Sequence, residues 1–356
     1  MRLPIPVRRA VERLRAYHPP LEGRRGKLRL DFNENTVGPS PAVRRALARL
    51  TPDRLAMYPE YEATERRLAR YFRVRPTELL VTNGTDDALR LVVDAFVEPG
   101  SSVLLVEPTF AMYRFYAELA GARILALHYD RALRFPLDQV LRALRRRGGR
   151  GRPRVMFLAN PNNPTGTLVG KADLRRILQA AQETLVVVDE AYFEFCGVTV
   201  LPWIRRCSNL VVTRTFSKAA GLAGLRAGFL FANERATAVL RKAHSPYPVN
   251  AAALVAAEAA ARDGRSLRNY AREVNRSKRL LEQALARLGI PFFPGAANFV
   301  LVDFGRRSAA LLRSLRRRGI LLRDRRADFS RGGYVRITLG TRAQTLRLLR
   351  ALERLW

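Results

Sequence analysis

The sequence predicts an α/β protein: a large domain whose mostly parallel sheet is covered by helices, and a smaller α+β domain. Short apolar runs typical of strands alternate with helical stretches between residues 78 and 231. Such alternation is typical of a parallel sheet with helices on both faces. From about residue 246 the pattern changes to a long helical region followed by strands and helices in mixed order. A length of 356 residues with 48% hydrophobic content gives enough core for both domains.

The chain begins with a segment that we expect to be an arm. Residues 1–37 would join the smaller domain, residues 38–245 would form the large domain, and residues 246–356 the smaller one. Within the arm, residues 28–32 are a candidate strand. Turn-forming residues follow, and then a helix with Ser40 as N-cap and Pro41 in its first position.

The remaining elements follow from apolar periodicity. Strands are predicted at residues 78–82, 102–106, 123–127, 154–158, 185–188, 210–213, 227–231, 298–304, 320–323 and 334–338. In the smaller domain, helices are predicted at residues 271–288, at 309–318 and from Thr341 onward.

Polar residues follow several of the predicted strands. They occur in residues 108–113, 160–166 and 189–192, each directly after an apolar run. In α/β proteins such strand ends meet at one edge of the sheet, where ligands bind. A glycine turn after residues 78–82, formed by Gly84, Thr85 and Asp86, opens a helix whose N-terminal N–H groups suit an anion.

Residues 213–228 hold Lys218, one of only five lysines in the chain. The sequence uses arginine for most of its cations, yet arginine cannot lose its proton, whereas a lysine can. A lysine in this place therefore indicates Schiff-base chemistry with a carbonyl. Because the nearby Thr215, Ser217 and Arg226 suit a phosphate and Lys218 suits an aldehyde, pyridoxal phosphate fits both.

The composition restricts the other functional classes. A net charge of +33 and a pI near 11.5 raise the possibility of nucleic-acid binding. The arginines are spread over polar helix faces, so a solvated basic surface is the preferred interpretation. Cys196 and Cys207 form no CxxC pair and the three histidines form no metal motif, so we expect a cytoplasmic protein without a metal site. The most apolar stretch, residues 251–261, is too short for a membrane span and carries Glu258.

In their order along the chain, these motifs resemble the fold-type I pyridoxal-phosphate-dependent aminotransferases, and among them the histidinol-phosphate aminotransferase group. The resemblance extends from Tyr17 to Thr338. It implies pyridoxal phosphate as cofactor and a homodimer. It also implies ping-pong transamination through a Lys218 Schiff base, with histidinol phosphate as amino donor and 2-oxoglutarate as acceptor.

The resemblance also implies roles for individual residues. Lys218 would act as general base and acid, and Asp189 would face the pyridine nitrogen of the cofactor. Asn163 and Tyr192 would bind its phenolic oxygen, and Tyr113 would stack on its ring. The cofactor phosphate would be held by Gly84, Thr85, Asp86, Thr215, Ser217, Arg226 and, from the neighbouring subunit, Tyr58.

On the substrate side, Arg336 would pair with the α-carboxylate, and Arg323 with Tyr17 would bind the distal phosphate. Asn33 lies in an Asn-Glu-Asn turn that resembles the family's turn near the site. The next residues, Thr36 and Val37, depart from the usual Pro-Leu.

Three alternatives stay open. An aromatic-amino-acid aminotransferase would share the cofactor residues and differ in the distal pocket. A threonine-phosphate decarboxylase would use the same apparatus to release carbon dioxide. A basic nucleic-acid-binding or regulatory protein with this fold would need a DNA-binding domain, for which about thirty residues before Asn33 leave no room.

Overall fold

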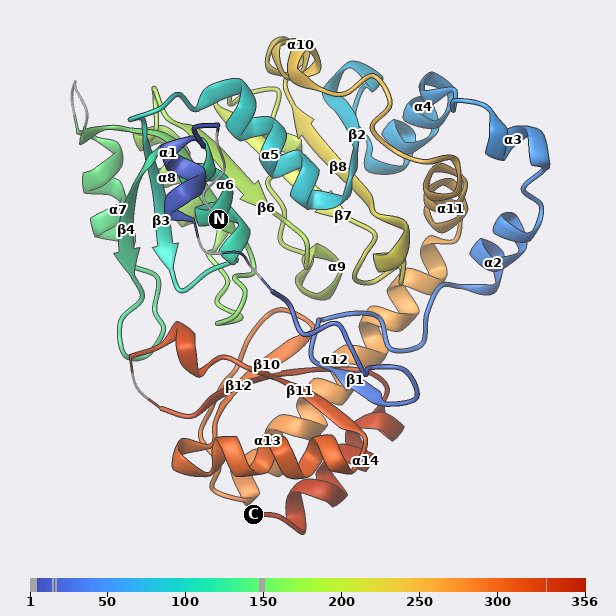
Figure 1. Ribbon diagram of the computed structural model, residues 1–356, viewed down its shortest axis with the longest axis vertical. Helices are drawn as coiled ribbons and strands as arrows, with labels where there is room; N and C mark the ends of the chain where they lie inside the picture. Colours follow the sequence, from blue (N-terminus) through green and yellow to red (C-terminus); the bar gives the residue numbers. More distant parts are fainter. Residues whose placement is uncertain (1–4, 15, 17, 147–150, 331) are drawn as a thin grey trace.

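The computed structural model describes residues 5–14, 16, 18–146, 151–330 and 332–356. It contains two sheets, each accompanied by helices, with the larger one in the upper half of Figure 1 and the smaller one in the lower half. The predicted α/β class is confirmed.

The larger sheet has seven strands in the order β2-β8-β7-β6-β5-β3-β4. They are β2 (Leu79–Asn83), β3 (Ser102–Glu107), β4 (Arg123–His128), β5 (Pro153–Ala159), β6 (Leu185–Asp189), β7 (Leu210–Thr215) and β8 (Ala227–Ala232). Strand β8 runs antiparallel to both of its neighbours, and the other pairings described within this seven-stranded sheet are parallel. The register places Ala159, Asp189 and Thr213 side by side, so three strand ends meet at one edge.

Helices cover both faces of this sheet because successive strand residues point to opposite sides. Val103 and Leu105 of β3 are buried with α5 (Gly84–Phe96), α6 (Ala111–Leu119) and α10 (Glu234–Ala243). Leu104 and Val106 are buried on the other face with α4 (Tyr61–Phe72), α7 (Leu137–Leu144) and α8 (Lys171–Ala180). Apolar residues on both faces explain the continuous apolar runs in the sequence.

Further helices precede the C-terminal part of the smaller unit. They are α1 (Arg9–Arg13), α2 (Pro41–Ala48), α3 (Pro52–Ala56), α9 (Phe193–Cys196) and α11 (Ala251–Arg262). The predicted start of α2 is confirmed, since the Ser40 hydroxyl accepts a bond from the Val43 N–H and Pro41 is the first helical residue.

The smaller sheet has five strands in the order β1-β11-β12-β10-β9. Its strands are β1 (Leu28–Leu30), β9 (Phe292–Phe293), β10 (Phe299–Asp303), β11 (Ile320–Asp324) and β12 (Tyr334–Thr338), and its helices are α12 (Gly264–Arg287), α13 (Ser308–Arg317) and α14 (Arg342–Glu353). Strand β1 pairs in parallel with β11, so the N-terminal segment forms an edge of this sheet.

Two features differ from the sequence-based expectation. The long helix expected at 271–288 begins at Gly264, because the Asp263 side chain caps its first turn. Helix α11 lies beyond the expected boundary at residue 246, yet it packs on α2 and α4 of the larger unit. Its buried alanines, Ala253, Ala256, Ala257 and Ala260, lie on one face, but nearly every position of its sequence is apolar, so no distinct stripe can be seen in the sequence. The domain limits themselves stay predictions.

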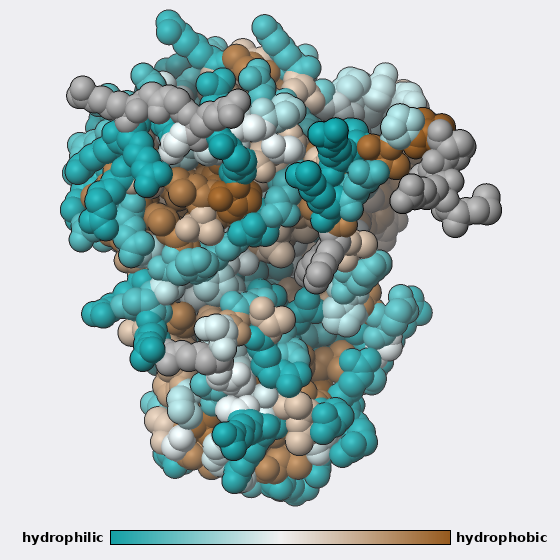
Figure 2. Space-filling view, turned by 60° about the vertical axis from the view of Figure 1, so that its left-hand side comes forward, coloured by the Kyte–Doolittle hydropathy of each residue, from teal (hydrophilic) through white to brown (hydrophobic). Residues whose placement is uncertain are grey.

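Hydrophilic side chains are spread over both the upper and the lower part of the face in Figure 2, without gathering in one patch. This distribution agrees with a dispersed net charge of +33. Across the described ranges, the helices lack a segment with the length and apolar character needed to cross a bilayer. Within the same ranges, His, Cys, Asp and Glu side chains form no group of three or more that could hold a metal ion.

Candidate active site

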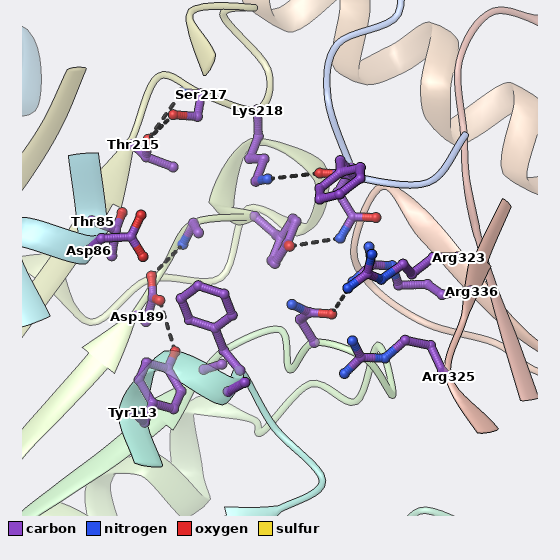
Figure 3. Close-up of a pocket in the computed structure, with 18 of the residues that line it drawn as sticks. Thr85, Asp86, Tyr113, Asp189, Thr215, Ser217, Lys218, Arg323, Arg325 and Arg336 are labelled. Atoms are coloured by element: carbon purple, nitrogen blue, oxygen red, sulfur yellow. Dashed lines mark hydrogen bonds between the residues drawn. The ribbon is translucent and has the colours of Figure 1, made fainter. Parts of the chain in front are cut away.

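One cavity lies between the strand ends of the larger sheet and the smaller sheet. Residues from both units line it: Phe32, Asn33, Thr85, Asp86, Phe110, Ala111, Tyr113, Ala159, Asn163, Asp189, Ala191, Tyr192, Thr215, Ser217, Lys218, Arg226, Arg323, Arg325 and Arg336. In Figure 3, Thr85, Asp86, Thr215 and Ser217 lie at one end and the three arginines of the smaller sheet at the other. Lys218 lies between the two ends, and Asp189 lies on the side of Thr85 and Asp86.

Lys218 follows β7, and its Nζ donates a hydrogen bond of 3.2 Å to the Phe32 carbonyl. Burial lowers the pKa of Lys218 to about 8, and the positive charge of Arg336 acts in the same direction. The negative charges of Glu34 and Asp86 only partly oppose this shift. The amine is therefore neutral far more often near neutral pH than that of an ordinary lysine, as a nucleophile or general base requires.

Asp189 ends β6 and is buried beneath the cavity. Burial raises the pKa of Asp189 to about 6, although a bond from the Tyr113 hydroxyl lowers it. That hydroxyl donates to Asp189 Oδ2 at 2.8 Å, and the N–H of Ala191 donates to Oδ1 at 3.1 Å. The carboxylate is thus fixed in orientation, with two donors that favour its charged form.

Tyr113 has a different place from the one expected. Its ring stacks on Phe157 at a centroid distance of 5.2 Å and is fully buried in the core. The expected ring stacking on a cofactor does not fit this position. Phe110, which precedes the first turn of α6, is only partly buried and lines the cavity. The side chain of Tyr113, three residues further along, instead packs against Phe157 of the sheet.

Asn163 and Tyr192 are each tied to residues of the opposite unit. The Arg336 Nη1 donates to Asn163 Oδ1 at 2.5 Å, and Asn33 Nδ2 donates to the Tyr192 hydroxyl at 2.8 Å. Asn33 has a left-handed φ of 56°, which asparagine tolerates better than most residues. The two halves of the cavity are thus joined by hydrogen bonds between side chains that face it.

The end near α5 has the properties of an anion site. Ser217 and Thr215 hydroxyls are bonded to each other at 2.9 Å, and Arg226 Nη1 approaches the Ser217 hydroxyl at 3.5 Å. The carboxylate of Asp86 accepts a bond of 2.7 Å from Arg226 Nη2, so Asp86 would offer an anion its backbone N–H in the first helical turn.

Two observations test whether a phosphate would fit there. Thr85 Oγ1 is buried without a hydrogen-bond partner, and it lines the same cavity. A Cβ on Gly84 would collide with the Arg226 guanidinium, and φ at this glycine is +76°. A free hydroxyl, helix N–H groups and an arginine that approaches a bare glycine form a fitting cradle for a phosphate.

Arg323, Arg325 and Arg336 come from β11, the segment after it, and β12. Arg336 Nη2 also donates to the Asp31 carbonyl at 2.6 Å, and Arg325 forms an ion pair with Asp328. Arg325 and Phe110 also line the cavity, although no motif in the sequence singled them out. Arg325 lies two residues after Arg323, and alternate residues of an extended chain point to the same side. This spacing could have indicated that both arginines face the cavity.

Residues 25–352 match the model of the family described as Aminotransferase class I and II. The chain belongs to this family. It is 38% identical to the histidinol-phosphate aminotransferase of Symbiobacterium thermophilum, with 98% of each chain covered. It is 39% identical to the one of Roseiflexus castenholzii, with 92% of this chain and 89% of that one covered. These relatives place it in the histidinol-phosphate aminotransferase group.

Solved structures agree with this assignment. Histidinol-phosphate aminotransferase from Sinorhizobium meliloti, in complex with pyridoxal-5'-phosphate, aligns with a TM-score of 0.83 and 27% identity, over 92% of this chain and 90% of that one. Aspartate aminotransferase of Thermus thermophilus aligns with a TM-score of 0.82 at 21% identity, which shows a shared fold.

In this aminotransferase, most of the residues singled out from the sequence line the one cavity. Gly84 supports it from beside Arg226. Tyr58 does not line it: its side chain is 74% exposed and stacks on Tyr247 at 4.3 Å. Tyr17 lies outside the described residues.

Proposed function

We propose that this aminotransferase uses pyridoxal phosphate to transfer the amino group of histidinol phosphate to 2-oxoglutarate, giving imidazole acetol phosphate and glutamate in histidine biosynthesis. The observation that carries the proposal is a lysine with a lowered pKa in one cavity with an anion cradle, a buried carboxylate and three arginines. The similarity to histidinol-phosphate aminotransferases over nearly the full chain supports the choice of substrate.

The cofactor residues divide by chemistry. Thr85, Ser217 and Arg226, with the N–H groups that begin α5, would hold the phosphate, and Asp189 would hold the pyridine nitrogen. Phe110 would cover one face of the ring. When bound, pyridoxal phosphate supplies an aldehyde for the amine and an electron-accepting ring for the substrate carbon.

Lys218 has two tasks in this scheme. Its neutral amine would hold the aldehyde of the cofactor. As a free amine, Lys218 would act as general base and then as general acid, taking a proton from the substrate carbon and giving it to the cofactor carbon. The pKa of about 8 suits both tasks, because protonated and neutral forms are both populated near neutral pH.

The arginine end would bind the anionic groups of the substrates. Histidinol phosphate carries its negative charge on a single phosphate ester and has no carboxylate, whereas 2-oxoglutarate carries two carboxylates. Planar guanidinium groups can pair with either through two parallel hydrogen bonds. Arg336, Arg323 and Arg325 line the cavity together and would serve both substrates in turn.

A homodimer is part of the proposal. Tyr58, Met57 and Leu55 are large side chains that are 74%, 68% and 64% exposed around the end of α3. An exposed apolar cluster of this kind suits a subunit contact, and Tyr58 would reach the cofactor phosphate of the neighbouring subunit. The free Cys196 and Cys207 agree with a reducing cytoplasmic setting.

The test is turnover of histidinol phosphate with 2-oxoglutarate by the purified enzyme, measured as glutamate formed. We expect a clear preference over phenylalanine with the same acceptor. Equal or reversed preference would assign the enzyme to the aromatic aminotransferases. Carbon dioxide released from threonine phosphate without an acceptor would assign it to the decarboxylases, one of which, from Porphyromonas gingivalis, shares the fold at 26% identity and a TM-score of 0.79.

A further inference from the structure

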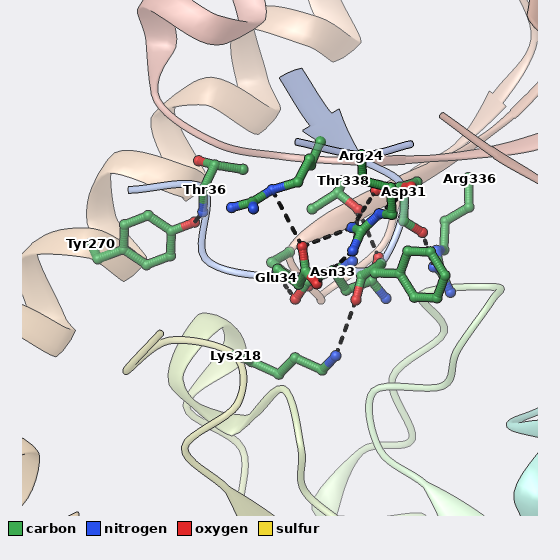
Figure 4. A network of polar contacts seen from close by, with 12 residues as sticks. Arg24, Asp31, Asn33, Glu34, Thr36, Lys218, Tyr270, Arg336 and Thr338 are labelled. Atoms are coloured by element: carbon green, nitrogen blue, oxygen red, sulfur yellow. Dashed lines mark hydrogen bonds and ion pairs between the residues drawn. The ribbon is translucent and has the colours of Figure 1, made fainter. Parts of the chain in front are cut away.

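One short turn of the N-terminal segment contacts three residues of the active site. The Asp31 carbonyl accepts a bond of 2.6 Å from Arg336, and the Phe32 carbonyl one of 3.2 Å from Lys218. The Asn33 amide donates to the Tyr192 hydroxyl at 2.8 Å. Figure 4 shows Lys218 and Arg336 pointing toward this turn. We call residues 31–36 the strap, because they connect the substrate arginine, the lysine and the tyrosine.

The far end of the strap is fastened to the smaller unit. The Thr36 N–H donates to the Tyr270 hydroxyl at 3.2 Å, and the Thr36 hydroxyl bonds to Gln344 at 2.6 Å. A proline at this position would lack the N–H, so the departure at Thr36 adds an anchor. In the middle, the Asn33 N–H donates to the Thr338 hydroxyl at 3.0 Å.

Arg24 fastens the near end. Its Nε and Nη2 donate to the two oxygens of Asp31 at 3.0 and 2.8 Å, and its Nη1 and Nη2 donate to those of Glu34 at 3.1 and 2.8 Å. Its guanidinium also lies 4.3 Å from the ring centroid of Phe32. The side chain is only 12% exposed, so these contacts are shielded from water.

The charges explain why an arginine is needed. Asp31 and Glu34 would repel each other across the strap without a cation between them. Although burial raises the pKa of Glu34, the hydrogen bonds and charge of Arg24 lower it, so Glu34 stays charged. A lysine could place its single ammonium on one carboxylate at a time, whereas a planar guanidinium spans both. Arg29 contributes less, since its Nε lies 3.7 Å from Glu34 and its side chain is 43% exposed.

We propose that Arg24 is a positioning residue for the transamination: it fixes the strap, and through the strap it sets the orientation of Arg336 and Tyr192 toward the substrate. This inference rests on the proposed function for its kinetic consequences. Arg24 does not line the active-site cavity, so its effect is transmitted through backbone carbonyls and the Asn33 side chain.

The test compares Arg24→Met and Arg24→Lys with Arg205→Met. Arg205 is a matched control because it forms a similar fork to a carboxylate, 2.7 and 2.8 Å from the oxygens of Glu78, outside the active-site cavity. Two readouts are needed. The first is hydrogen exchange of the peptide covering residues 31–38 in the full-length protein. The second is function, measured as the dissociation constant of pyridoxal phosphate and as kcat/KM for each substrate.

For Arg24→Met we expect exchange in that peptide to be about tenfold faster or more. We also expect kcat/KM for both substrates to fall about tenfold or more, since small displacements of substrate-binding groups cost that much. Cofactor affinity should stay within about threefold, because the hydrogen bonds given above for Ser217 and Arg226 do not involve the strap, and the Thr85 hydroxyl has no partner there either. Arg24→Lys should have intermediate exchange and kinetics, and Arg205→Met should match the wild type in both readouts.

Wild-type exchange in Arg24→Met would overturn the inference, and so would a loss of cofactor affinity equal to the loss in kcat/KM, which would indicate general destabilisation. If Arg24→Met does not fold, Arg24→Lys decides the question by the same two readouts. Failure of the wild type to turn over histidinol phosphate would refute the proposed function alone, because the exchange measurement needs no substrate.

Discussion

At the scale of single residues, the central feature is a lysine whose chemistry is set by its surroundings. Lys218 lies partly buried between cationic arginines and two carboxylates, and burial dominates, so its pKa falls to about 8. The same side chain on the surface would be almost wholly protonated at neutral pH. Asp189 shows the opposite response, since burial raises its pKa to about 6. One cavity thus holds an amine that can lose its proton and an acid that two donors keep ionised.

The lowered pKa of Lys218 predicts how the cofactor-free enzyme takes up pyridoxal phosphate. The neutral amine is the reactive form, so the rate of covalent capture should rise as pH increases through about 8 and then level off. An ordinary lysine would give a rise centred near about 10.4. Stopped-flow absorbance across this pH range measures the midpoint, and a midpoint above 10 would contradict the burial argument.

At the scale of elements, the junction of β2 with α5 creates the anion cradle. Gly84 begins the helix with φ +76°, and the Arg226 guanidinium occupies the space beside it that a side chain would need. The strand positions the turn, the turn exposes the first N–H groups, and the helix orients them toward the cavity.

Replacing Gly84 with alanine should therefore displace Arg226 and weaken pyridoxal phosphate binding about tenfold or more, the typical loss for one charge-assisted hydrogen bond. Gly100→Ala is the matched control, because Gly100 also has a positive φ of +82° but nothing within 4 Å of its added Cβ. Both variants should lose about 1–2 kcal/mol of stability from backbone strain. Fluorescence titration and thermal unfolding separate the two effects, and equal cofactor affinity in both variants would refute the crowding argument.

The sequence allowed these elements to be predicted to different extents. Continuous apolar runs identified β3, β5, β6 and β7 with ends accurate to one or two residues, because buried parallel strands lack polar alternation. The polar residues directly after these strands indicated the site, because the ends of parallel strands meet at one edge of the sheet, where ligands bind. Helix α11 was missed because apolar residues occupy nearly every position of its sequence, so no polar face marks the helical period.

Residues that act through tertiary contacts could not be found in this way. Arg24 is one arginine among many in the sequence, and its role depends on a fork to two carboxylates that folding places beside it. Tyr113 was assigned to the cofactor ring because the sequence alone does not tell which aromatic residue near a helix start faces the cavity. In the structure Phe110 precedes α6 and is only partly buried, whereas Tyr113, in the first turn of α6, is fully buried.

At the scale of the whole molecule, the active site is built from two units, and one tyrosine that the sequence assigned to the site lies exposed outside it. The N-terminal segment adds β1 to the smaller sheet and then crosses to the larger one through the strap, so both units share the site (Figure 1). Tyr58 and Tyr247 form an exposed stacked pair instead of lining the cavity. In the proposed homodimer, Tyr58 would complete the neighbouring site.

A shared site predicts complementation between two inactive variants. Lys218→Ala and Tyr58→Ala should each have little activity alone. Mixed dimers would contain one site with both residues intact, so unfolding and refolding the two together should restore about a quarter of wild-type turnover. Each variant refolded alone is the control. Activity in the mixture no greater than the average of the two controls would show that Tyr58 does not serve the neighbouring subunit.

The assignment of Lys218 as the residue that holds the cofactor underlies the whole account, and it can be tested chemically. The purified enzyme with pyridoxal phosphate is reduced with borohydride, digested and analysed by mass spectrometry. Only five lysines are present, so the modified peptide is easily identified. We predict that the added pyridoxyl phosphate mass lies on Lys218. The same mass on Lys27, Lys171, Lys242 or Lys278, with Lys218 unmodified, would contradict the account.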